Sequence, residues 1–472
     1  MSIDFKTATI SEYVSETKKN PGAIDDAVTY FAKNIKNENE NLNAYIEAFG
    51  DLGEQVKCIK TKIADGEDLP LCGVPFGIKD LILIKDRKCS AGSRILEDYV
   101  ATYDATVINR LRDAGAIFLG RTNMDEFAMG GSNEHSAYGI ARNPHDTGRV
   151  PGGSSGGSAI VVAADMALCA LGSDTGGSVR QPASFCGVVG MKPTYGRISR
   201  FGLMAMASSL DQIGPIGRTV DDVRRIYEVV SGFDENDATS LKDNATKKER
   251  TKKLAYPRKF LEEGIDKDIF ENFEKVVDGL RADGYQIDDI DISYLEHTLA
   301  MYYIIMPAEA SSNLARYDGI KYGLSVPNTD HIDIFFKARG DGFGEEVRRR
   351  IMLGTYVLSS GYYDAYYNKA VNARDLLKRS FEKIFDSYDG ILLPTSPVPA
   401  WKIGERSNDP MQMYLADIYT VSANLLGIPA ISVPTGTVIR DDKKLPIGTQ
   451  VLCPWNEEEI LFDTASDIEN NA

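Results

Sequence analysis

The sequence predicts an α/β fold in which one large, mostly parallel mixed sheet is covered by helices. Two observations lead to this fold class. Segments with helical periodicity alternate with short, continuous apolar runs, which are typical of strands buried on both faces of a sheet. Strand-like runs return late, at 390–394 and 428–434. The last part of the chain is therefore expected to complete a sheet that begins near residue 70.

The bulk composition is that of an ordinary globular protein, with 43% hydrophobic and 26% charged residues in a chain of 472. Its formal net charge of -16 argues against direct binding of nucleic-acid phosphates by this chain, and leaves such binding to a basic partner. The N-terminus lacks a basic segment followed by an apolar one. The longest apolar stretch, Ala159–Leu171, contains Asp165 and is shorter than the roughly 20 residues of a membrane-spanning helix. We therefore expect a cytoplasmic protein without membrane association.

The cysteines and histidines show no spacing typical of a metal site. None of the six cysteines belongs to a C-x-x-C pair, so we expect free, buried thiols in a reducing compartment. None of the four histidines lies in an H-E-x-x-H motif. We therefore expect no metal in this chain.

The first part of the chain, residues 1–68, is polar and has apolar positions at helical spacing, with an Asn-Pro-Gly break at 20–22. A continuous apolar stretch at 69–82 then predicts a strand that enters a buried sheet. A helix at 105–114 and a strand at 116–120 follow. This order of elements repeats the alternation on which the fold class rests.

Between residues 130 and 217 the composition shifts toward glycine and serine. A flexible linker would have such a composition, but here the glycine clusters alternate with apolar segments at 160–164 and 166–171 that must be buried. Tight turns and close backbone approach explain these glycines better.

The remaining segments complete the predicted organisation. Residues 233–300 are charged and are expected to form surface helices and connections, whereas 345–388 are expected to be helical. With no repeat and no hinge-like linker, we expect one domain over 1–472. Within it, 1–68 form an N-terminal helical segment and 70–217 form the catalytic core.

Two familiar catalytic motifs are poorly supported. Gly152-Gly-Ser-Ser-Gly matches the G-x-S-x-G pattern of α/β-hydrolases at Ser154, and the shifted frame matches it at Ser155. That mechanism requires a later histidine, but only His297 and His331 follow, and neither lies in a recognisable strand-end loop. A phosphate-binding P-loop is also unsupported, because no Gly-Lys-Ser/Thr follows a glycine-rich turn.

Lys79 lies in an otherwise apolar strand. A buried lysine loses the hydration of its ammonium group, so its pKa falls and the neutral amine can act as a base. Alternatively, the side chain reaches solvent from the strand end or pairs with Asp80. Considered alone, Lys79 fits this second interpretation better.

Three segments resemble, in order, the signature blocks of the amidase signature family: Gly73–Asp80, Pro151–Ser158 and Gly172–Pro182. Three blocks in the right order are more specific than any single glycine-rich turn. The resemblance implies one α/β/α domain built on a large mixed sheet, with a Ser-Ser-Lys catalytic triad.

The resemblance also assigns the members of this triad. It implies that Lys79 is the base, that Ser154 is a bridging serine in a cis peptide after Gly153, and that Ser178 is the nucleophile. A neutral amine can draw a proton from Ser154, which draws one from Ser178, and the same relay can return a proton to departing ammonia.

The loop before the nucleophile is expected to stabilise the oxyanion of the tetrahedral intermediate. The candidate donors are the backbone N–H groups of Thr175, Gly176 and Gly177, since preorganised donors of this kind stabilise the charge that develops in the transition state. Asp174 and Arg180 are expected to pair behind this loop as structural support.

Beyond the signature, the chain resembles the A subunits of bacterial aspartyl/glutamyl-tRNA amidotransferases within this family. The segments that carry this likeness are 122–132, 308–319, 349–355 and 359–367. The resemblance implies hydrolysis of glutamine and transfer of ammonia within a heterotrimer containing two further subunits. The partner would use ATP and Mg²⁺ and bind misacylated tRNA, while this chain would hold no cofactor.

Glutamine carries an α-carboxylate and an α-ammonium group, so a selective site needs one charge of each sign. The resemblance assigns Arg350 to the carboxylate and Asp417 to the ammonium. Tyr302 is a weaker candidate, and its neighbour Tyr303 is an alternative at the same position. Two further arginines precede Arg350, so a solvated basic helix face stays open as another interpretation. The alternative function is a stand-alone amidase that hydrolyses small or acyl amides.

Overall fold

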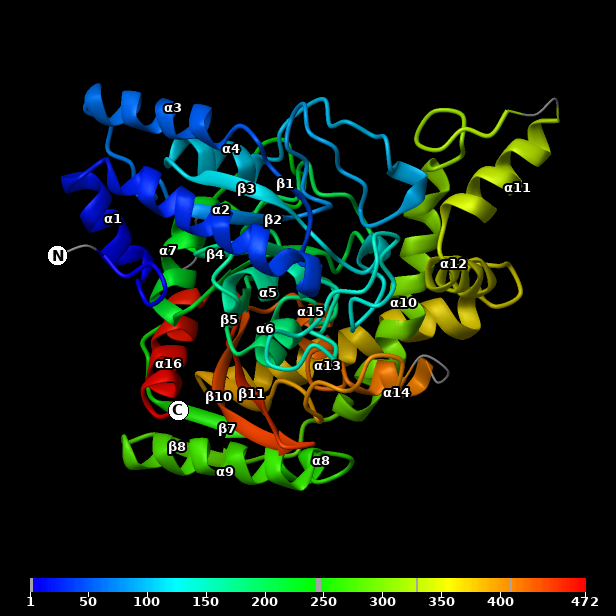
Figure 1. Cartoon of the computed structure of the whole chain (residues 1–472). Coiled ribbons are helices and arrows are strands. Elements are labelled where there is room, and N and C mark those ends of the chain that lie inside the picture. Colours follow the sequence, from blue (N-terminus) through cyan, green and yellow to red (C-terminus); the bar gives the residue numbers. More distant parts are fainter. Residues whose placement is uncertain (1–2, 243–247, 328–329, 407–409) are drawn as a thin grey trace.

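An 11-stranded sheet runs through the part of the chain that the computed structural model describes, which is residues 3–242, 248–327, 330–406 and 410–472 (Figure 1). The strand order is β1-β3-β2-β4-β6-β5-β10-β11-β9-β7-β8. The strands are β1 (Tyr45–Ala48), β2 (Pro75–Lys79), β3 (Ile117–Thr122), β4 (Cys169–Asp174), β5 (Val189–Lys192), β6 (Gln212–Gly217), β7 (Lys253–Tyr256), β8 (Gln286–Asp289), β9 (Gly390–Pro394), β10 (Ala430–Arg440) and β11 (Lys443–Leu452).

The α/β class and the mixed sheet are confirmed, but the expectation of a mostly parallel sheet is wrong. Parallel pairing is confined to two groups, β3-β2-β4 and β9-β7-β8, and the other neighbouring strands are antiparallel. A strand buried on both faces has the same continuous apolar pattern in either direction. The sequence pattern therefore predicted burial correctly but could not predict strand direction.

Helices cover both faces of the central strands, since every residue of β2, β3, β4, β5, β6 and β9 is buried. The helices α1–α4 gather near β1–β3, and α8 and α9 lie near β7 and β8 (Figure 1). The helices are α1 (Ile10–Lys19), α2 (Ala23–Leu42), α3 (Leu52–Ala64), α4 (Thr106–Asp113), α5 (Gly156–Ala163), α6 (Arg180–Cys186), α7 (Val220–Val230), α8 (Arg258–Leu261), α9 (Lys267–Ala282), α10 (Thr298–Asn313), α11 (His331–Gly342), α12 (Glu345–Val357), α13 (Lys369–Phe385), α14 (Pro410–Leu415), α15 (Val421–Leu426) and α16 (Glu458–Asn470).

The N-terminal segment is helical as predicted, but it also contributes an edge strand. α1 begins with a capping box, in which Thr9 accepts a hydrogen bond from the Glu12 N–H and its own N–H donates to the Glu12 carboxylate. The Asn-Pro-Gly sequence at 20–22 separates α1 from α2. The short strand β1 was not predicted, because only its first residue is fully buried and the period-2 signal is weak.

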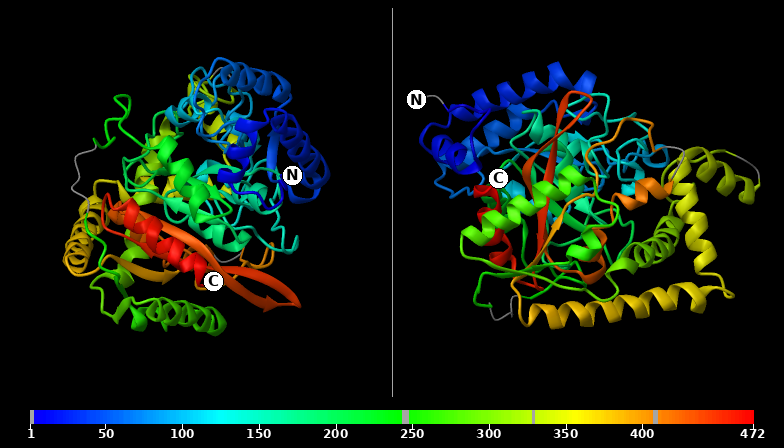
Figure 2. Two further views of the ribbon diagram at one scale, coloured as in Figure 1. Left: turned by 90° about the vertical axis from the view of Figure 1, so that its left-hand side faces the viewer. Right: turned by 90° about the horizontal axis from the view of Figure 1, so that it is seen from below.

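The expectation of surface helices alone over 233–300 is also wrong, since β7 and β8 lie in this segment and close the far edge of the sheet. Both are four-residue strands with charged residues, which hide their pattern in the sequence. The predicted helical segment at 345–388 is confirmed as α12, a π-helix at Tyr363–Asn368, and α13. The helices α11 and α12 lie at the end of the molecule remote from both termini (Figure 2).

All six cysteines are free thiols, as expected; five are buried and Cys58 is exposed. Within the described ranges, no helix combines the length and the apolar character needed to cross a membrane.

The topology brings three chain segments to one edge of the sheet. β2 pairs in parallel with both β3 and β4, so the carboxyl ends of these three strands lie side by side. Ligands of α/β proteins commonly bind at such an edge. The packed helices α10 and α12 supply further side chains to the same region.

The crossing of α10 and α12 depends on Gly354. A Cβ atom at this position would lie 1.8 Å from the Pro307 carbonyl oxygen, so even alanine would push the helices apart. We expect Gly354→Ala to destabilise the protein by about 1–3 kcal/mol, the usual cost of overpacking, and to lower its thermal unfolding midpoint.

Gly340→Ala is the matched control, because Gly340 also lies in a helix but a Cβ there has no neighbour within 4 Å. Unchanged stability of Gly354→Ala, measured under the same conditions, would contradict this account of the helix crossing.

Candidate active site

The amine of Lys79 lies in a pocket of serine hydroxyls at the carboxyl end of β2, and the residue is 0% exposed. Its Nζ atom is 2.8 Å from the Oγ atoms of both Ser154 and Ser155. It is also 2.9 Å from the Ser173 Oγ and 3.3 Å from the Ser173 carbonyl oxygen. The alternative in which this lysine reaches solvent is therefore wrong. The pairing with Asp80 is wrong as well, since Asp80 instead binds Arg121.

Burial lowers the pKa of Lys79 to about 7, although the nearby carboxylates Asp125, Asp174 and Asp211 partly oppose this shift. A substantial fraction of the lysine is therefore the neutral amine near neutral pH.

The hydrogen bonds around Lys79 indicate what its lone pair can do. The Ser155 hydroxyl donates to the Ser173 carbonyl, 3.1 Å away, so its oxygen must accept from the lysine. Ser173 supplies further acceptors on the same side. With its two N–H groups directed to these oxygens, a neutral amine has its lone pair available for the Ser154 hydroxyl. This geometry suits a base that takes a proton from Ser154.

Ser154 lies in a tightly packed turn before α5, and the peptide bond between Gly153 and Ser154 is cis, as expected. Only glycine fits before it, because a Cβ on Gly153 would lie 2.1 Å from an Asp125 carboxylate oxygen. The side chain of Gln181 fastens this turn by accepting from the Gly153 N–H at 2.9 Å and donating to the Gly131 carbonyl.

Ser178 lies beside this turn, in the loop between β4 and α6. The Ser155 N–H donates to the Ser178 carbonyl over 3.1 Å, which holds the two glycine-rich loops together. Ser178 is 8% exposed, whereas Ser154 and Lys79 are fully buried. Its hydroxyl makes no hydrogen bond to another described residue, so the Ser178–Ser154 link of the relay is not formed in this conformation.

Asp174 holds the nucleophile loop in shape. Its carboxylate accepts from the N–H groups of Gly177 and Val179, from Nε and Nη2 of Arg180, and from the Asn424 amide. Burial acts to raise the pKa of Asp174, but the charge and hydrogen bonds of Arg180 outweigh it and hold the pKa at about 2. The predicted pairing of Asp174 with Arg180 is confirmed.

The three expected oxyanion donors are not equivalent. The Gly177 N–H already donates to Asp174 at 2.8 Å, which differs from the expectation that it is free for substrate. Among the hydrogen bonds of the described residues, none uses the N–H of Thr175 or Gly176. A Cβ on Gly176 would lie 2.6 Å from the Tyr302 ring, so glycine is needed here for close approach of α10. This contact brings Tyr302 to the nucleophile loop.

Arg350 projects from α12 into the protein and is 3% exposed, while Arg348 on the same helix is exposed. The interpretation of Arg350 as part of a solvated face is therefore wrong. Its Nε donates to Glu346 over 2.8 Å, and its guanidinium carbon lies 5.7 Å from the centre of the Tyr303 ring.

Asp417 follows α14 and lies on the other side of Tyr303, whose hydroxyl donates to it over 3.2 Å. Its second carboxylate oxygen would be 3.8 Å from a Cβ on Gly131, next to the Gln181 amide that fastens the Ser154 turn. Both Tyr303 and Asp417 keep part of their surface exposed. Burial raises the pKa of Asp417 to about 7, opposed mainly by the charge of Arg350. The two predicted substrate-binding charges thus flank one tyrosine.

Several residues of the site could not be identified from the sequence. Ser155 and Ser173 belong to the predicted glycine-serine clusters, and their position beside Ser154 and Asp174 was the signal available. Distant residues gave no signal. They hold the site from remote parts of the chain: Asp125, Gln181, Asp211, Glu346, Tyr414, Thr420 and Asn424.

A buried neutral lysine beside two serines defines the class of this protein as a hydrolase with a serine nucleophile and a lysine base. The family model described as Amidase matches residues 26–462, and the chain belongs to this family.

Its relatives narrow the comparison. The A subunit of the glutamyl-tRNA(Gln) amidotransferase of Methylacidiphilum infernorum is 54% identical over 405 residues, which are 83% of this chain and 81% of that protein. The protein of the same name from Clostridium botulinum (strain Eklund 17B / Type B) is 44% identical over 483 residues, covering 99% of this chain and 98% of that protein. The crystal structure of the corresponding glutamyl-tRNA(Gln) amidotransferase protein from Thermotoga maritima matches with a TM-score of 0.82 and 40% identity, over 100% of this chain and 96% of that one.

Two substitutions separate the base from its supports. We expect Lys79→Met to lower kcat for amide hydrolysis roughly 10⁴-fold or more, because the serine nucleophile loses its activating base. Ser173→Ala removes one of the acceptors around the amine and is expected to cost about tenfold or less. Steady-state assays of ammonia release measure both values. Equal losses in the two variants would contradict the assignment of Lys79 as the base.

Proposed function

We propose that this chain is the glutamine-hydrolysing subunit of a tRNA-dependent amidotransferase, and that the ammonia it releases serves a partner subunit. The observation that carries the proposal is the pair of opposite charges, Arg350 and Asp417, on either side of Tyr303. Tyr302, the preceding residue of α10, contacts the nucleophile loop at Gly176. A substrate with amino-acid charges at one end and a carboxamide at the other suits this arrangement.

The first half of the reaction forms an ester on Ser178. Its Oγ attacks the carboxamide carbon while its proton passes to Ser154, whose own proton passes to Lys79. The N–H groups of Thr175 and Gly176 are the free donors for the resulting oxyanion. As the carbon–nitrogen bond breaks, the relay returns the proton to the leaving nitrogen, and ammonia departs.

The second half hydrolyses the ester. Water attacks the glutamyl carbonyl, and its proton moves along the same relay to Lys79. The proton then returns through Ser154 to Ser178 as the ester bond breaks, so glutamate leaves and the enzyme is regenerated. One glutamine and one water therefore yield one glutamate and one ammonia.

Recognition of the amino-acid end follows from charge. The guanidinium of Arg350 can bind the α-carboxylate in a fork-like geometry, and the carboxylate of Asp417 can bind the α-ammonium. A stand-alone amidase acting on small or acyl amides would have no use for two opposite charges held in this way. The names of the relatives in Methylacidiphilum, Clostridium and Thermotoga also support the amidotransferase.

The acceptor chemistry is assigned to the partners. We propose a heterotrimer in which the other two subunits use ATP and Mg²⁺ and bind tRNA misacylated with glutamate or aspartate. A net charge of -16 makes this chain unsuited to bind tRNA directly. The choice between glutamate and aspartate would then lie outside this chain.

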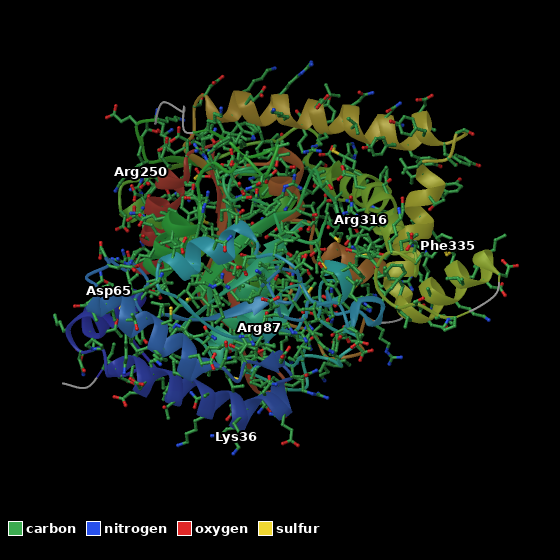
Figure 3. The ribbon with its side chains drawn as sticks, turned by 90° about the horizontal axis from the view of Figure 1, so that it is seen from above. Lys36, Asp65, Arg87, Arg250, Arg316 and Phe335 are labelled. Carbon is green, nitrogen blue, oxygen red and sulfur yellow. The ribbon has the colours of Figure 1, made fainter. Side chains whose placement is uncertain are left out.

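A surface suited to a partner subunit lies on α11, α12 and the π-helix. Large apolar side chains are exposed there, including Phe336 at 74% and Met352 at 72%. Figure 3 shows Phe335 on α11 at the periphery of the molecule. Exposed apolar patches of this kind mark protein–protein contacts. Because α12 also carries Arg350 on its inner side, a partner bound here would contact the helix that recognises glutamine.

The decisive test replaces the nucleophile in the assembled complex. We expect Ser178→Ala, co-expressed with the two partner subunits, to lose glutamine-dependent amidation of misacylated tRNA roughly 10⁴-fold or more. Amidation supplied with ammonium chloride should change less than about twofold, because the ATP-dependent step lies in a partner.

The control is Ser387→Ala, which alters an exposed serine after α13 and should leave both activities intact. Retained use of glutamine by Ser178→Ala would contradict the assigned nucleophile. Loss of the ammonia-supported reaction in an intact complex would contradict the division of labour between subunits.

A further inference from the structure

The amino-acid end of the site contains two opposite charges that attract each other. In a poorly hydrated pocket such an attraction is strong, and direct pairing of Arg350 with Asp417 would remove both charges from the substrate. Among the ion pairs of the described residues, none joins these two side chains. The structure must therefore contain groups that hold the two charges apart.

Tyr303 separates the two charges. Its hydroxyl donates to Asp417, and its ring faces the guanidinium of Arg350. Its ring in turn stacks on the ring of Tyr414, with 3.9 Å between the centroids and 26° between the planes. The guanidinium carbon of Arg350 lies 5.6 Å from the centre of this second ring. A stacked pair of tyrosines thus forms the wall between the cation and the anion.

Glu346 connects both parts of this arrangement. It is 2% exposed, and its carboxylate accepts from Nε of Arg350 over 2.8 Å and from the Tyr414 hydroxyl over 3.1 Å. It also accepts from Arg349. Burial acts to raise the pKa of Glu346, but the charge and hydrogen bond of Arg350 outweigh it and lower the pKa. A charged carboxylate therefore binds the Nε edge of Arg350 and the outer tyrosine at once.

We propose that Glu346 is a positioning residue that holds the guanidinium of Arg350 toward the substrate carboxylate and away from Asp417. This inference rests on the proposed function, because it concerns the binding of the two charges of glutamine. Since Glu346 binds Nε, the Nη atoms of the guanidinium are left for a ligand. The Nη1 atom makes only a weak contact, 3.7 Å long, with the Sδ atom of Met306, which carries no charge.

A simpler explanation is that Glu346 only compensates the buried charge of Arg350. The two explanations differ in what happens when Asp417 is also neutralised. If Glu346 only supports the fold, its loss costs the same with or without the Asp417 charge. If Glu346 keeps Arg350 from Asp417, its loss has little effect once Asp417 can no longer attract the guanidinium.

The test is a double-mutant cycle on glutamine hydrolysis by the assembled complex. We expect Glu346→Gln to raise the KM for glutamine about tenfold or more and to change kcat less than about twofold. In an Asp417→Asn background, which itself raises KM, the same substitution should change KM less than about twofold. Glu346→Asp keeps the charge on a shorter arm and should lie between wild type and Glu346→Gln, which keeps the test valid if Glu346→Gln does not fold.

Glu345→Gln is the matched control, because Glu345 is the exposed neighbour that pairs with Arg349, and its KM should not change. An unchanged KM in Glu346→Gln would overturn the inference, as would an equal rise in KM in the Asp417→Asn background. Arg350→Ala tests the proposed function separately. An unchanged KM in that variant would contradict the glutamine site itself, whereas a raised KM there with no effect of Glu346→Gln would overturn only the role of Glu346.

Discussion

The site depends on one physical constraint, the burial of the Lys79 amine among serine hydroxyls. Burial lowers the pKa of this lysine to about 7, and the surrounding oxygens orient its lone pair toward Ser154. The nearby carboxylates would restore the charge of the lysine if they were not held by other partners. Asp174 is neutralised by Arg180, and Asp211 accepts from the Thr175 hydroxyl and from two backbone N–H groups. The base is therefore neutral because its anionic neighbours are bound elsewhere.

The same principle governs the amino-acid end of the site. Arg350 and Asp417 are kept apart by Tyr303, as Lys79 and Asp174 are kept apart by Arg180. In both places a group that already satisfies one charge leaves the other free for chemistry. The sheet makes this possible, because the parallel strands β3, β2 and β4 end at one edge and bring separate buried charges together.

Much of the catalytic core could be predicted from the sequence, because its chemistry lies in short local motifs. The glycines around Ser154 and Ser178 signal close backbone approach, and the cis bond after Gly153 and the Asp174–Arg180 pair are present as expected. Strand direction could not be predicted, nor could the weakly patterned strands β1, β7 and β8. The hydrogen bond that occupies the Gly177 N–H depends on the loop's folded shape. The role of residues such as Glu346 depends on contacts between helices distant in the chain, which leave no local pattern.

The central claim, that Lys79 is a neutral base acting on Ser178, is tested most directly by the pH dependence of Ser178 reactivity. The rate at which a fluorophosphonate labels Ser178 reports activation of the nucleophile without requiring glutamine binding. The account predicts that this rate rises with pH through a midpoint of about 7 and reaches a plateau, and that labelling is nearly lost in Lys79→Met. A rate independent of pH, or a midpoint near the ordinary lysine value of about 10, would contradict it.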